Sequence, residues 1–152
     1  MGAMPITENE SDLVEQRPGR ERDNGNMLVA LIAWFYQRRK ELGIEVFPSQ
    51  DLQVSPARRI TADVCVTIGV PDEQVFIAPP FLCVEIHSVF VPMASQLRRI
   101  ADYLNFGVRH VWHIDPHWRT AAAYTSSAAI WPEDGILRTA NPDIALPLDE
   151  LF

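Results

Sequence analysis

Two carboxylates lie inside stretches of sequence that are otherwise apolar. Asp63 interrupts the β-branched run 60–68, and Glu85 interrupts the apolar run 81–87. A charged carboxylate inside a protein core is costly unless another group pairs with it. A hard divalent cation, which prefers oxygen ligands, is one such partner. Asp63 and Glu85 are therefore the first candidates for a chemical site, and metal-assisted chemistry is what this pair favours.

The spacing of the two carboxylates predicts that they face each other. If their strands pair in antiparallel fashion across the intervening loop, the centre of that loop is Gln74, and Asp63 and Glu85 each lie eleven residues from it. Alternation of side chains along a strand then places Cys65 and Cys83 on the same side of the sheet. Two carboxylates this close repel each other, which raises the pKa of one of them. A bound cation relieves that repulsion.

Ion pairs within the protein are the alternative role for these carboxylates. Asp63 could pair with the arginines at 58–59, and Glu85 with those at 98–99. Together with the arginines at 38–39, the arginines at 58–59 and 98–99 could instead form a surface that binds phosphate. Their simpler role is as solvated charges in ordinary ion pairs.

The elements that must position the carboxylates follow from apolar periodicity. A helix is predicted from about residue 24 to a stop at Gly43, and a second helix over 93–106 with Gly107 as its stop. The second helix is expected to bury the apolar side chains Leu97, Ile100, Ala101 and Leu104. Strands are expected at 44–47, 52–54, 60–68, 81–87, 108–114, 120–125 and 128–131. This order predicts an α/β (α+β) fold with a central mixed β-sheet flanked by α-helices.

Length and composition restrict the class of protein. The 152 residues are 47% hydrophobic and 22% charged, as expected for one globular domain. The polar segment 1–23 is predicted to be a flexible N-terminal segment and 24–152 to form the domain. No apolar run is long enough to span a membrane. Two cysteines within apolar runs, without a secretion signal, indicate reduced thiols in a cytoplasmic protein.

The charged residues argue against a general nucleic-acid binder. The net charge is −7, the wrong sign for affinity that depends on neutralising phosphates, although local basic patches can still act. Lys40 is the single lysine of the chain.

A zinc site is not expected at His110, His113 and His117, because the first two lie three apart on a predicted strand and point to opposite faces.

The segments that contain the carboxylates resemble a known family. They are, in order, RITADV at 59–64, PPFLCVEIHS at 79–88, RIADYLNFGV at 99–108, VWHIDP at 111–116 and LDELF at 148–152. Their order and spacing resemble the bacterial family of putative restriction endonucleases, a branch of the PD-(D/E)XK nuclease superfamily. The resemblance covers residues 24–152.

The resemblance implies a restriction endonuclease-like fold and hydrolysis of phosphodiester bonds in DNA. It implies a Mg²⁺ or Mn²⁺ site made by Asp63 and Glu85, with the Ile86 carbonyl as a third ligand. Such a metal holds the scissile phosphate and lowers the pKa of an attacking water. A homodimer is also expected, mainly from the resemblance.

The sequence departs from the family pattern at the lysine that completes such sites. The superfamily places it two residues after the glutamate, where this chain has His87, and this branch places it four residues before the tyrosine, where this chain has Arg99. Arg99 can grip phosphate but cannot act as a base, whereas His87 can accept a proton. A DNA endonuclease, a non-catalytic binding or oligomeric module, and a small-molecule hydrolase using the same carboxylates all stay open.

Overall fold

The computed structural model describes residues 20–152, so most of the predicted N-terminal segment 1–23 lies outside the described residues. No helix in this range is long and apolar enough to cross a membrane. The helices are α2 (Arg22–Leu42) and α3 (Met93–Phe106), with a short 3-10 helix η1 (Leu148–Glu150). The strands are β1 (Glu45–Ser55), β2 (Arg58–Thr67), β3 (Leu82–Ile86), β4 (His110–Asp115), β5 (Thr120–Tyr124), β6 (Ala129–Ile130), β7 (Ile136–Thr139) and β8 (Ile144–Pro147).

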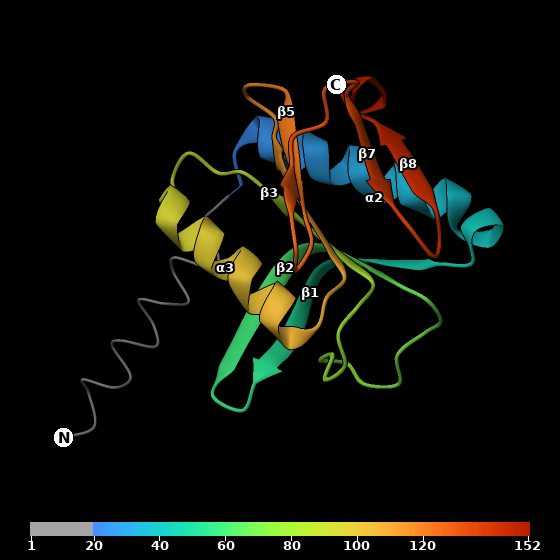
Figure 1. The fold of residues 1–152 in the computed structure, drawn as a ribbon, viewed down its shortest axis with the longest axis vertical. Helices are drawn as coiled ribbons and strands as arrows, with labels where there is room; N and C mark the ends of the chain where they lie inside the picture. The colour runs from blue at the N-terminus through green and yellow to red at the C-terminus, as the bar shows by residue number, and fades with distance from the viewer. Residues whose placement is uncertain (1–19) are drawn as a thin grey trace.

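The main sheet is mixed, as the sequence predicts. Its six strands lie in the order β1-β2-β3-β4-β5-β6. Only β3 and β4 are parallel, and α3 makes the crossover that a parallel pair requires. The last two strands, β7 and β8, were not predicted and form a separate hairpin that lies beside α2 (Figure 1).

The two helices cover opposite faces of the main sheet (Figure 1). Leu31 of α2 packs in one core cluster with Val84 of β3, whereas Ile100 of α3 packs in another with Cys83. Successive strand residues point to opposite faces. Glu85 therefore shares the α3 face with Cys83.

The predicted register of β2 and β3 is confirmed. Val64 pairs with Val84 and Cys65 with Cys83, which is the alignment that brings Asp63 opposite Glu85. Val64 and Val84 pack in the core cluster on the α2 face, and Cys65 and Cys83 pack in the cluster on the α3 face. A slip of one residue would move the side chains of one strand to the opposite face.

Two predictions about the elements were wrong. The segments 44–47 and 52–54 belong to one continuous strand, β1, which absorbs the irregularity at Ser49 with a φ of 48°. On α3, Leu97 is 47% exposed and Ala101 is also exposed, while Gln96 is buried. The face of α3 that packs against the sheet differs from the expected apolar face, because polar side chains of α3 form hydrogen bonds with the sheet and with the loop that follows β3.

Candidate active site

Asp63 and Glu85 are interlocked through the backbone of the neighbouring strand. The Asp63 N–H donates to Glu85 Oε2 at 3.2 Å, and the Ile86 N–H donates to Asp63 Oδ2 at 2.8 Å. Each carboxylate therefore accepts a hydrogen bond from the main chain beside the other. The structure brings together the three residues that the resemblance implies as metal ligands.

Glu85 forms a buried ion pair with α3. Its Oε1 accepts hydrogen bonds from Arg99 Nε at 2.6 Å and from the Tyr103 hydroxyl at 2.9 Å. The side chains of Glu85 and Arg99 are only 8% and 16% exposed. Arg99 also donates through Nη2 to the Thr61 carbonyl, so it links α3 to both β2 and β3.

The ionisation of this cluster reflects its burial. Burial raises the pKa of Glu85, the charge of Asp63 adds to the rise, and Arg99 opposes it. Burial alone would lower the pKa of Arg99, but Glu85 raises it above its ordinary value, so the guanidinium stays charged. Burial, followed by Glu85, also raises the pKa of the Tyr103 hydroxyl. Arg99 therefore supplies a permanent positive charge and no base.

Asp63 pairs with an arginine that sequence reasoning did not identify. Arg20 Nη2 lies 2.7 Å from Asp63 Oδ1, and this pair is more exposed, since the Asp63 side chain is 21% exposed. Arg20 also donates to Asn24 Oδ1, and Asn24 donates to the His87 carbonyl at 3.2 Å. The start of α2 thus lies directly against the carboxylate site.

His87 lies next to the same cluster but contacts a different part of α3. Its Nδ1 is 3.1 Å from Gln96 Oε1, and the same oxygen is 2.6 Å from Nε2 of His113. Burial, with a further contribution from His87, lowers the pKa of His113 to about 4. His113 is therefore a neutral imidazole near neutral pH.

The donors at this site fit a hard divalent cation. Mg²⁺ is commonly held by one or two carboxylates, with water and substrate phosphate completing its coordination. Asp63 and Glu85 supply that number. The Ile86 carbonyl, the third expected ligand, lies 3.5 Å from the side-chain nitrogen of Asn24. No group of three or more acidic, histidine or cysteine side chains suited to a metal occurs within residues 20–152. A cation at Asp63 would have to replace the charge that Arg20 now supplies.

The other candidate side chains take structural roles. Cys65 and Cys83 are free, buried thiols with their sulfurs 3.9 Å apart, and burial raises the pKa of Cys83. Arg58 pairs with Asp102 at 2.7 Å instead of with Asp63. Lys40 lies in the last turn of α2 and completes no site among the described residues.

Sequence reasoning missed the polar residues that surround the carboxylates. Gln96 and Tyr103 lie three residues before and four residues after Arg99, which places all three side chains on one side of α3. That spacing is a usable signal for a polar helix face turned toward a site. Arg20 offered no comparable signal, because it precedes the predicted domain.

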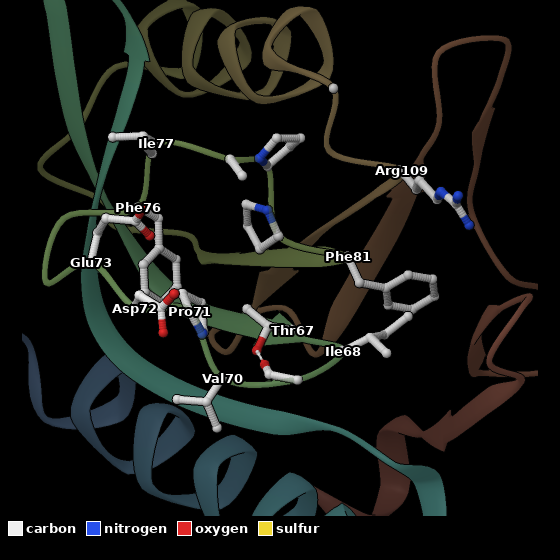
Figure 2. Close-up of a pocket in the computed structure, with 15 residues that line it drawn as sticks. Thr67, Ile68, Val70, Pro71, Asp72, Glu73, Phe76, Ile77, Phe81 and Arg109 are labelled. Atoms are coloured by element: carbon white, nitrogen blue, oxygen red, sulfur yellow. Dashed lines mark hydrogen bonds between the residues drawn. The ribbon is translucent and has the colours of Figure 1, made fainter.

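A second concave region lies away from the carboxylates. A hollow of about 650 Å³ is lined by the loop between β2 and β3, together with Arg109 (Figure 2). Asp72 and Glu73 line it as acidic side chains, whereas Val70 and Ile77 are apolar. Neither Asp63 nor Glu85 lines the hollow, so it is separate from the candidate site.

Comparisons with known proteins agree with this architecture. The profile of the Uma2 family, described as putative restriction endonuclease, matches residues 10–150. No curated protein matches the chain. The crystal structure of a putative nuclease belonging to DUF820 from Anabaena variabilis is similar, with a TM-score of 0.76 at 16% identity over 90% of this chain and 83% of that chain. This likeness shows a restriction endonuclease-like fold, and because the profile spans most of the sequence, the chain belongs to the Uma2 family of putative restriction endonucleases.

Proposed function

We propose that this protein is a metal-dependent DNA endonuclease that hydrolyses phosphodiester bonds at Asp63 and Glu85. The observation that carries the proposal is the interlocked pair itself. Asp63 and Glu85 lie on adjacent strands, where Glu85 accepts a hydrogen bond from the Asp63 N–H and Asp63 accepts one from the N–H of Ile86, the residue after Glu85. Membership of a nuclease family supports this chemistry.

The chain's own residues take distinct roles in this proposal. Asp63, Glu85 and the Ile86 carbonyl hold Mg²⁺ or Mn²⁺, which supplies Lewis-acid activation of water and phosphate when bound. Arg99 takes the place of the family lysine, opposes the rise in the pKa of Glu85 that burial causes, and orients the Glu85 carboxylate. Among residues 20–152, Arg99 makes its hydrogen bonds through Nε and Nη2, which leaves Nη1 to bind a phosphate oxygen. His87 is the proton acceptor.

Calorimetric titration with Mn²⁺ tests the metal site. We expect saturable binding by the native protein and no binding by Asp63→Asn, because the exposed carboxylate of the pair is lost. Asp102→Asn is the matched control, because it removes a carboxylate that pairs with Arg58 and is not one of the proposed metal ligands. Metal binding that survives Asp63→Asn would refute the assignment.

Cleavage of supercoiled plasmid DNA tests the reaction. We expect nicking or linearisation that requires Mn²⁺ or Mg²⁺ and is lost in Asp63→Asn and Glu85→Gln. Hydrolysis of a simple phosphodiester without cleavage of DNA would assign the same site to a small-molecule hydrolase. The proposal includes a homodimer, which sedimentation equilibrium of the purified chain tests.

One observation favours a second candidate, a non-catalytic binding or oligomeric module. Both carboxylates are already paired with arginines, Asp63 with Arg20 and Glu85 with Arg99. Such pairs would hold the site together without a metal. This alternative predicts no Mn²⁺ binding and no cleavage, and activity that depends on Asp63 and Glu85 would exclude it.

A further inference from the structure

The amide of Gln96 has one possible orientation in the structure. Its nitrogen lies 3.2 Å from the Ser88 carbonyl and 3.1 Å from the Val91 carbonyl. Carbonyl oxygens only accept hydrogen bonds, so the NH₂ group must face them. The Gln96 side chain is buried, and reversing the amide would leave two carbonyls facing an oxygen. Gln96 Oε1 is therefore fixed toward the two imidazoles.

This orientation dictates which nitrogen of each imidazole carries a proton. Gln96 Oε1 can only accept, so both ring nitrogens that contact it must donate. These are His113 Nε2 at 2.6 Å and His87 Nδ1 at 3.1 Å. A neutral imidazole carries one proton. A neutral His87 is thus the Nδ1–H tautomer, and its Nε2 carries a lone pair.

The position of the His87 ring is fixed as well as its tautomer. The His87 N–H donates to the Ile114 carbonyl at 2.7 Å, and the ring lies edge-to-face on His113 with centroids 5.4 Å apart. No described residue in 20–152 makes a hydrogen bond to His87 Nε2. Nε2 is thus a preset acceptor that no side chain or main-chain group in the described part of the chain occupies.

His87 and Glu85 both face α3. Glu85 is held by Arg99, and His87 is held by Gln96, which lies three residues earlier on the same helix. We propose that Gln96 is a positioning residue that fixes His87 as the Nδ1–H tautomer and presents Nε2 as a hydrogen-bond acceptor toward the attacking water. This role for Nε2 rests on the proposed endonuclease function, whereas the tautomer does not.

Nitrogen-15 spectroscopy of the imidazoles tests the inference on the native, metal-free protein. At mildly alkaline pH, where solution imidazoles are neutral, we expect a protonated Nδ1 and an unprotonated Nε2 for His87. For His113 we expect the reverse pattern. A neutral His87 that carries its proton on Nε2 would overturn the proposal, and this measurement needs no variant.

A pair of variants separates positioning from a general effect on α3. Gln96→Leu removes the acceptor, and we expect His87 to lose its single tautomer, whereas Asn105→Ala, an exposed change on the same helix, leaves the tautomer unchanged. A His87 tautomer that persists in a folded Gln96→Leu protein would also overturn the proposal.

The kinetic readout distinguishes this inference from the proposed function. If the native protein cleaves DNA, Gln96→Leu is expected to lower kcat by about tenfold or more while KM and Mn²⁺ affinity stay unchanged, because Gln96 touches none of the proposed metal ligands. An unchanged kcat would refute the role of Nε2. If the native protein does not cleave DNA, the endonuclease proposal and the role of Nε2 both fail, while the spectra still decide the tautomer.

Discussion

Removal of Arg99 should destabilise the protein, because it leaves the buried carboxylate of Glu85 without its positive partner. Arg99→Met keeps most of the apolar stem of the side chain but removes the charge that faces Glu85. Breaking a buried ion pair by removing one partner costs about 3–5 kcal/mol. Glu85 keeps its hydrogen bonds from Tyr103 and from the Asp63 N–H, so the lower end of that range is expected.

The loss of stability in Arg99→Met should depend on pH. Without Arg99, the main influences left on Glu85 are burial and the charge of Asp63, and both raise its pKa from 4.5. A carboxyl group whose pKa is raised by folding contributes stability that is present below the unfolded pKa and lost as pH rises through the folded pKa. Relative to the native protein, Arg99→Met should therefore lose less unfolding free energy at pH ~5 than at pH ~8.

Urea unfolding of four proteins measures this effect. They are the native chain, Arg99→Met, Glu85→Gln and the double variant, which form a double-mutant cycle. We expect the double variant to recover much of the stability lost by Arg99→Met, because no uncompensated charge remains buried. A loss below about 1 kcal/mol, as for a surface pair, or a loss that does not change with pH, would refute the reasoning.

Three further predictions concern neighbouring features. Folding lowers the pKa of His113 from 6.5 to about 4, so the native free energy of unfolding should fall as pH drops through that window, by up to ~3 kcal/mol. Urea unfolding of His113→Gln should show a weaker pH dependence, and an equal dependence would contradict this account. Gly107→Ala should lower the unfolding free energy by about 1–2 kcal/mol, since φ is 113° and a Cβ would lie 3.2 Å from Pro79; an unchanged denaturation midpoint would argue against this strain. Arg20→Ala should tighten Mn²⁺ binding at Asp63 by up to about fivefold in calorimetry, because the competing cation is lost; weaker binding would show that Arg20 supports the metal site.

The sequence by itself determined the part of the fold that depends on short-range rules. Strand alternation and the equal spacing of Asp63 and Glu85 from Gln74 predicted the β2–β3 register that the structure has. The helix over 93–106 and its stop at Gly107 were also predicted, because apolar periodicity and a left-handed glycine are local properties. The separate β7–β8 hairpin lacked such a pattern and was missed.

The partners of the carboxylates were decided only by the tertiary structure. The sequence offered several arginines to Asp63 and Glu85, and the fold selects Arg99 for Glu85 but brings Arg20 to Asp63 from 43 positions away. Gln96 was not identified from the sequence. Its role depends on two contacts that only the fold creates: its amide nitrogen lies against the Ser88 and Val91 carbonyls, and its amide oxygen lies against two imidazoles. Periodicity indicates that a helix forms, whereas the side chains that the helix buries and the partners of its buried polar groups depend on how separate elements pack against each other.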